Sequence, residues 1–116
     1  MSILIVGDRK HARRSLAALL RASLPRSEVR EAASASEAVG LAGGAPPRVV
    51  VLDVPAPDAE GLRSVREIRC RWPDARILVL TLHRCGPDQA AVADADAVVS
   101  KSEPPDRLLS ALSALL

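Results

Sequence analysis

The stretch "VVVLDVPAPDAEGL" at residues 49–62 carries one aspartate, Asp53, directly after four branched apolar residues. Prolines and a glycine follow it, so the apolar run ends in a turn. A short apolar run without alternation is typical of a strand buried on both faces, as in a parallel sheet. The stretch therefore predicts a central strand that delivers one carboxylate to its carboxyl end. By itself it leaves open whether Asp53 caps the next segment or takes part in chemistry.

Other parts of the chain carry similar apolar runs. The clear ones are "ILIV" (3–6) and "ILVL" (77–80), and the weaker ones are "EVREA" (28–32) and "AVV" (97–99). The alternation in 28–32 is typical of a strand near the edge of a sheet. Together with 49–52, these runs predict five strands.

Helical patterns lie between the predicted strands. Apolar residues recur at helical spacing in 9–22 and in 59–71, and Ser34 opens a short helix with a capping-box glutamate three residues later. A short, poor helix is expected at 86–93, and two prolines start a final helix that ends in "LLSALSALL". Regular alternation of strands and helices predicts a doubly wound, open parallel sheet. We expect a single α/β domain over residues 1–116.

Composition excludes several classes of protein. Hydrophobic residues make up 48% and charged residues 26% of the 116 residues, which is ordinary for a soluble globular domain. The net charge is only +2 and the basic residues are spread evenly, so direct nucleic-acid binding is not expected. No apolar run is long enough for a membrane span, and no signal-peptide pattern is present. Cys70 and Cys85 lack metal-ligand spacing, and we expect reduced thiols in a cytoplasmic protein.

Functional side chains recur at the ends of the predicted strands. Asp8 comes just after the first strand, Asp53 after the third, Thr81 after the fourth and Lys101 after the fifth. Any one of them has an ordinary explanation, because an aspartate can cap a helix and a lysine can lie in solvent. Ligands of doubly wound sheets, however, bind at the carboxyl ends of the strands. Four such residues at one edge therefore predict a site.

The chemistry of this set favours a phosphoryl group. The carboxylates of Asp8 and Asp53 are hard oxygen ligands that suit Mg²⁺. A lysine ammonium and a threonine hydroxyl are groups that hold phosphoryl oxygens. No Ser-His-Asp or Cys-His arrangement is visible, and His11 and His83 are expected at the surface. The basic run "RKHARR" (9–14) is expected to be a solvated helix face.

Four stretches match the pattern of one family. They are "ILIVGDRKHARRSLAALL", "VVVLDVPAPDAEGL", "RWPDARILVLT" and "ADAVVSKSEPPDRLLSAL". On these stretches the chain resembles the receiver domain of two-component response regulators, the LuxR type in particular, over nearly its whole length. The resemblance implies a flavodoxin-like (CheY-like) fold of five strand-helix units with strand order 2-1-3-4-5. It also implies a phosphoacceptor signalling domain that is not an enzyme beyond its own phosphotransfer and dephosphorylation.

The resemblance also implies roles for individual residues. Asp53 would accept a phosphoryl group from a histidine kinase or a phosphotransfer protein. Mg²⁺ would be held by Asp8, Asp53 and the backbone carbonyl of Pro55. Thr81 and Lys101 would contact the phosphoryl group, and the first helix would border the surface on which the kinase docks.

Several positions depart from the family pattern. Gly7 replaces the first of two acidic residues, Leu82 stands where a small residue is usual, and Val98 replaces an aromatic switch residue. Pro55 stands where a flexible polar residue is typical, although its carbonyl is still able to bind a metal. Loss of the carboxylate at Gly7 predicts weak Mg²⁺ binding.

Alternatives remain at this point. A degenerate receiver that acts as a phosphorylation-independent interaction module is the main one. A hydrolase of the haloacid dehalogenase type is disfavoured, because it needs a second carboxylate where Pro55 stands. The apolar end of the chain suits a core helix, a homodimer interface, or the start of a connection to a DNA-binding output domain in transcription regulation.

Overall fold

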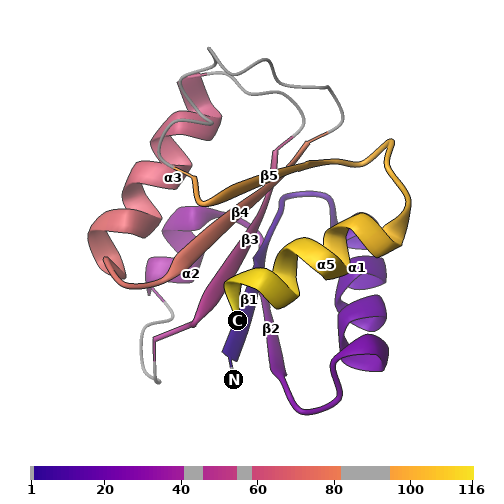
Figure 1. Cartoon of the computed structure of the whole chain (residues 1–116). Helices are drawn as coiled ribbons and strands as arrows, with labels where there is room; N and C mark the ends of the chain where they lie inside the picture. The colour runs from indigo at the N-terminus through magenta and orange to yellow at the C-terminus, as the bar shows by residue number, and fades with distance from the viewer. Residues whose placement is uncertain (1, 41–45, 55–58, 82–94) are drawn as a thin grey trace.

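The computed structural model describes residues 2–40, 46–54, 59–81 and 95–116, with backbone only at 59–60. Five parallel strands form one sheet in the order β2-β1-β3-β4-β5 (Figure 1). The strands are β1 (Ser2–Val6), β2 (Glu28–Ala32), β3 (Val49–Val54), β4 (Arg76–Thr81) and β5 (Ala97–Ser100). This confirms the predicted flavodoxin-like topology, with the alternating segment 28–32 at one edge.

Helices cover both faces of the sheet. They are α1 (Lys10–Ser23), α2 (Ala35–Gly40), α3 (Ala59–Arg71) and α5 (Pro105–Leu115). Helices α1 and α5 lie on one face, and α2 and α3 lie on the other (Figure 1). The helix expected at 86–93 lies outside the described residues. None of the helices in the described ranges is long and apolar enough to cross a membrane.

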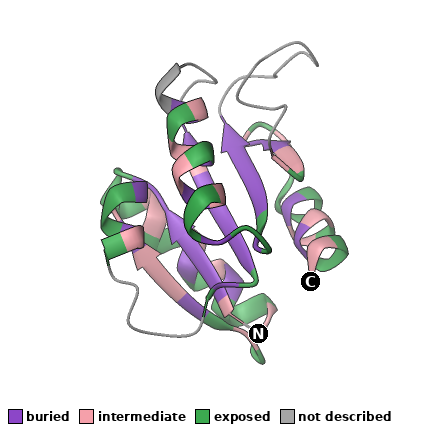
Figure 2. Ribbon diagram, turned by 90° about the vertical axis from the view of Figure 1, so that its left-hand side faces the viewer, coloured by how far each residue is buried: buried purple, intermediate pink, exposed green. Residues whose placement is uncertain are grey.

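The strands are apolar throughout because they are buried on both sides. In β1, Leu4 packs with the α2–α3 side, whereas Ile3 and Ile5 pack with the α1–α5 side. The same split recurs in β3, where Val50 and Val51 belong to opposite layers of core. Figure 2 shows the buried strands between helices that are exposed on their outer faces. Double burial thus explains why the strand sequences do not alternate.

Two strands extend beyond their apolar runs. In the ladder between β3 and β4, Asp53 is opposite Leu80 and Val54 is opposite Thr81. The prediction that β3 ends before Asp53 is therefore wrong by two residues. Main-chain hydrogen bonding continues past the last branched residue because it does not depend on the polarity of the side chain.

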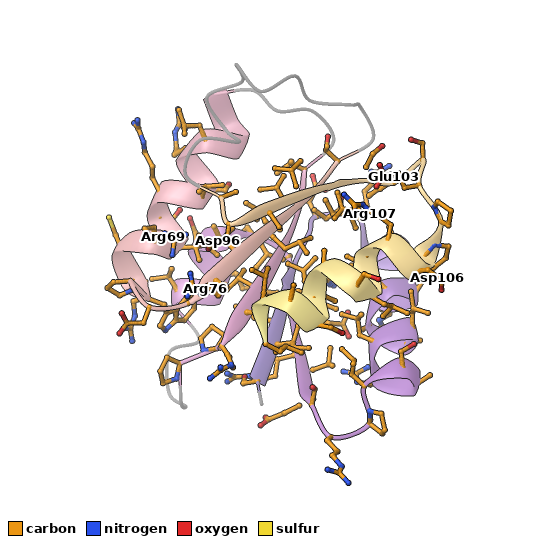
Figure 3. All side chains as sticks on the ribbon, in the orientation of Figure 1. Arg69, Arg76, Asp96, Glu103, Asp106 and Arg107 are labelled. Carbon is orange, nitrogen blue, oxygen red and sulfur yellow. The ribbon has the colours of Figure 1, made fainter. Side chains whose placement is uncertain are left out.

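Helix ends and faces follow from local sequence. The Ser34 hydroxyl accepts a hydrogen bond from the backbone N–H of Glu37 at 3.1 Å, as the capping pattern predicts. In α5, Leu108 and Leu112 are buried, and the other leucines and Ala111 are partly buried against the same core. The exposed positions of α5 are polar or small. One of them, Arg107, forms an ion pair at 3.5 Å with Glu103, which lies just before α5 (Figure 3). Core packing therefore accounts for most of the apolar side chains in the C-terminal segment "LLSALSALL".

Candidate functional site

The side chain of Asp53 is only 5% exposed, and it lies near the carboxyl end of the central strand β3. Its Oδ1 atom forms an ion pair with the Lys101 ammonium at 2.6 Å. A buried carboxylate is costly unless a charge of opposite sign lies close to it. Lys101 is therefore the cation that lies against the buried Asp53 side chain at this position.

Backbone contacts place Lys101 beside Asp53. Lys101 directly follows β5, and its backbone N–H donates to the Thr81 carbonyl oxygen at 2.7 Å. The next turn is closed by the backbone N–H of Ser102, which donates to the Ser100 hydroxyl at 3.2 Å, and by that of Glu103, which donates to the Ser100 carbonyl at 3.1 Å. The ammonium is held at the sheet edge while its side chain stays 20% exposed.

Thr81 is the last residue of β4 and is fully buried. It pairs in register with Val54, the residue next to Asp53. In the part of the chain that the structure describes, its hydroxyl Oγ1 has no hydrogen-bond partner. An unsatisfied buried hydroxyl costs about 1–3 kcal/mol, so such groups are uncommon away from functional sites. This hydroxyl is available to donate to an oxygen atom that enters the site.

Gly7 lies directly against Asp53. Its backbone N–H donates to the Ala32 carbonyl oxygen at 3.0 Å, which extends the pairing of β1 with β2. A Cβ atom at Gly7 would lie 3.2 Å from the Asp53 Cβ and 3.6 Å from its Oδ2. Absence of a side chain at position 7 thus lets the Asp53 carboxylate approach the end of β1. Asp8 follows and is exposed.

Arg13 is a residue of this region that the sequence analysis missed. Its Nη1 donates to the Gly7 carbonyl oxygen at 2.6 Å, and its Nε donates to Glu31 Oε1 at 3.2 Å. Its side chain is only 14% exposed, so the expectation of a solvated face for 9–14 is wrong at this position. The spacing of Arg13, Ala17 and Leu20 at i, i+4 and i+7 places all three on the buried face of α1 and was the available signal.

The remaining predicted residues are placed only in part. Val98 lies in β5 and is partly buried against the core on the α2–α3 side. Pro55 and Leu82 lie outside the described residues, as do Cys85 and His83. His11 is exposed, as expected, and Cys70 is an exposed free thiol.

Two carboxylates at this end of the sheet have the oxygen donors that Mg²⁺ uses in proteins. No group of three metal-binding side chains occurs within the described ranges. Asp8, just after β1, and Asp53, in the neighbouring strand β3, are the carboxylates that the family resemblance assigns to the metal. Mg²⁺ in proteins commonly uses one or two carboxylates and keeps several water molecules. These two residues therefore fit the ion, while Gly7 contributes no charge to it.

The chain matches one protein family over nearly its whole length. Residues 3–113 match the response regulator receiver domain. The chain belongs to this family. The receiver is 40% identical over 81 residues to the DNA-binding transcriptional activator DevR/DosR of Mycobacterium tuberculosis, a match that covers 70% of this chain and 37% of that protein. It spans about half, or less, of the length of the curated relatives that it matches.

Solved structures agree with the receiver fold. A LuxR-family two-component response regulator from Aurantimonas sp. SI85-9A1 matches with a TM-score of 0.83 and 32% identity, covering 98% of this chain and 83% of that chain. The response regulator TrrA of Thermotoga maritima, solved in complex with Mg²⁺ and BeF, also gives a TM-score of 0.83, with 30% identity over 99% of this chain and 98% of that chain. Both structural matches cover at least 98% of this chain and therefore include the whole described sheet.

Proposed function

We propose that this receiver accepts a phosphoryl group on Asp53 from the phosphohistidine of a histidine kinase or a phosphotransfer protein. The observation that carries the proposal is the buried Asp53 carboxylate, which is ion-paired to Lys101. It lies next to β4, which ends in the Thr81 hydroxyl, a group without a hydrogen-bond partner among the described residues. These are the parts needed for phosphoryl transfer, which depends on positioning and on compensation of charge.

In the proposed step, an Asp53 carboxylate oxygen attacks the phosphorus atom. The bond from phosphorus to the donor histidine nitrogen breaks, and that nitrogen leaves with the electron pair. Lys101 exchanges part of its pairing with Asp53 for the new phosphoryl oxygens, and the Thr81 hydroxyl donates to one of them. Mg²⁺, held by Asp8, Asp53 and the Pro55 carbonyl, would neutralise further phosphoryl charge when bound.

The relatives support this assignment and extend it. TrrA has also been solved in complex with the histidine kinase ThkA, with a TM-score of 0.82 to this chain at 30% identity. DevR/DosR is a DNA-binding transcriptional activator that is longer than this chain. We infer that the receiver acts in the cytoplasm, exchanges phosphoryl groups with a kinase, and controls an output such as transcription, through self-association that includes α5.

A degenerate receiver remains the second candidate, and two observations favour it. Gly7 removes a metal-binding carboxylate, and Asp53 is closely paired with Lys101. If that pair is never opened, the domain binds its partners in one state only.

Incubation with acetyl phosphate and Mg²⁺ separates the two candidates. We expect intact-mass spectrometry to show one added phosphoryl group on the wild-type protein and none on Asp53→Asn. Asp74→Asn, which changes an exposed aspartate at the far edge of the sheet, is the matched control and keeps the adduct. No adduct on the wild-type protein at any donor concentration would leave the interaction module as the function.

A further inference from the structure

Segment 7–9 joins β1 to α1 and carries Asp8, one of the two carboxylates proposed to hold Mg²⁺. The N-cap of α1 is Arg9, which makes no side-chain capping hydrogen bond with any described residue, and the first turn of α1 has no acidic residue. Gly7 has no side chain, and glycine loses the most backbone freedom when it is fixed. Contacts from outside the segment must therefore hold Asp8 in one position.

Arg13 supplies such contacts at both ends of the segment. It lies in the first turn of α1, and its Nη1 atom donates to the Gly7 carbonyl oxygen at 2.6 Å. A hydrogen bond from a charged guanidinium is stronger than one between neutral groups. The backbone N–H of Arg13 donates to the Arg9 carbonyl oxygen at 2.9 Å. One residue thus ties the first and the last carbonyl of segment 7–9.

Glu31 in β2 fixes the direction of the guanidinium. Its Oε1 atom accepts a hydrogen bond from Arg13 Nε at 3.2 Å, and Arg21 lies 3.8 Å from its Oε2. The side chains of Arg13 and Glu31 are 14% and 22% exposed, so the pair is largely shielded from water. Helix α1, strand β2 and the end of β1 are thereby joined around the segment that carries Asp8.

We propose that Arg13 is a positioning residue for Mg²⁺ binding, which holds segment 7–9 so that the Asp8 carboxylate can bind the same ion as Asp53. The inference rests on the proposed role of these two aspartates. Groups that orient a metal ligand without touching the metal change its affinity by about 10- to 100-fold when they are replaced. Arg13 acts through the backbone beside the ligand, so we expect the lower part of this range or somewhat less.

The sign of the effect separates positioning from charge. A guanidinium repels Mg²⁺, so its removal tightens metal binding if charge alone matters. We expect Arg13→Gln to weaken Mg²⁺ binding by about three- to tenfold instead. Arg14→Gln removes the same charge at the exposed neighbouring position and should leave the affinity unchanged or slightly tighter. Amide shifts of Asp53 in a Mg²⁺ titration at constant ionic strength measure all three proteins.

Arg13→Lys keeps the charge and tests the geometry. Lysine lacks the planar fork that reaches Gly7 and Glu31 together, so this variant should also bind Mg²⁺ more weakly than the wild-type protein. Thermal unfolding checks that each variant is folded. If Arg13→Gln is unfolded, Arg13→Lys takes its place in the comparison.

A second readout needs no metal. NMR relaxation of the backbone amides gives order parameters, which are about 0.85 in a rigid backbone and below about 0.6 in a flexible one. In the metal-free protein we expect the order parameter of Asp8 to fall in Arg13→Gln, while that of Leu4 in the middle of β1 stays at the rigid value. Lower stability alone, without a change in segment 7–9, would not single out Asp8.

Failure of this inference is distinct from failure of the proposed function. An affinity for Mg²⁺ that is unchanged or tighter in Arg13→Gln, or in Arg13→Lys where it takes its place, overturns the positioning role. Absence of Mg²⁺-dependent shifts in the wild-type protein overturns it as well. Both results leave Asp53 as the acceptor, which adduct formation from acetyl phosphate tests separately. Absence of the adduct beside the expected Mg²⁺ titrations overturns the proposed function and leaves Arg13 as a positioning residue.

Discussion

Two aspartates at opposite ends of the parallel strands show how differently a carboxylate is used. Asp96 directly precedes β5, and its Oδ2 accepts hydrogen bonds from the backbone N–H of Ile77 at 2.7 Å and from Arg69 at 2.9 Å (Figure 3). Arg76 lies 3.5 Å from its Oδ1. Asp53, near the carboxyl end of β3, has Lys101 as its one ion-pair partner among the described residues.

The environment of Asp96 stabilises its charged form. Burial raises the pKa of Asp96, but the hydrogen bonds from Ile77 and Arg69 and the charges of Arg69 and Arg76 outweigh it and lower the pKa below the usual range. Asp96 thereby ties α3, β4 and the start of β5 together. A structural carboxylate has its acceptor capacity filled, whereas the carboxylate proposed to react has capacity left for an incoming group.

The largest effect is expected for the stability of Asp96→Asn. Hydrogen bonds to a charged group contribute about 1.5–3 kcal/mol, so we expect the free energy of unfolding to fall by about 2 kcal/mol. Urea denaturation at neutral pH measures it. Asp74→Asn, at an exposed position, should change stability by less than about 0.5 kcal/mol. If Asp53→Asn destabilises the protein as much as Asp96→Asn does, the two carboxylates do not differ in the way described.

The pH dependence of that loss has a definite sign. Because the folded-state pKa of Asp96 is lowered, its contribution is present above the unfolded-state pKa and is lost as pH falls through the folded-state pKa. The difference between wild type and Asp96→Asn should therefore shrink below about pH 4, near the ordinary aspartate value. A difference that grows on acidification contradicts the assignment.

A smaller effect is expected when the missing carboxylate is restored. Gly7→Asp adds one negative charge near the metal, which is worth about 1 kcal/mol or somewhat more, so we expect about tenfold tighter Mg²⁺ binding. The new Cβ would lie 3.2 Å from the Asp53 Cβ, so the two strands must shift by a few tenths of an ångström. Amide shifts of Asp8 and Asp53 in a Mg²⁺ titration report the affinity.

Gly7→Ala separates crowding from charge in the same titration. It adds the Cβ without the carboxylate, and we expect it to weaken Mg²⁺ binding or leave it unchanged. If Gly7→Asp and Gly7→Ala bind Mg²⁺ equally, the charge at this position has no role in the site.

Only a small change in stability is expected for Thr81→Val. Valine has the shape of threonine and removes a buried hydroxyl without a partner in the described structure, so the free energy of unfolding should change by less than about 1 kcal/mol. Adduct formation from acetyl phosphate should nevertheless slow down. Chemical denaturation and intact-mass kinetics measure the two effects. A loss of stability above about 2 kcal/mol would show that the hydroxyl is already satisfied in the folded protein.

Much of the fold follows from local sequence. The runs at 3–6, 49–52 and 77–80 are apolar on both sides, and a strand with two apolar faces needs helices on both. The alternation of strands and helices then places Asp53, Thr81 and Lys101 at one edge, because parallel strands end together. Strand boundaries were less accurate at Asp53 and Thr81, since main-chain pairing extends beyond the apolar residues.

The sequence by itself therefore determined the layers, the strand order expected from the family resemblance, and the edge at which the site lies. Only the tertiary structure decided that Lys101 pairs with Asp53 and that Gly7 leaves room beside the carboxylate. The physical reason is the range of the interactions. Strand and helix signals depend on neighbours within a few residues, whereas these contacts join segments whose separation is set only when the sheet has formed.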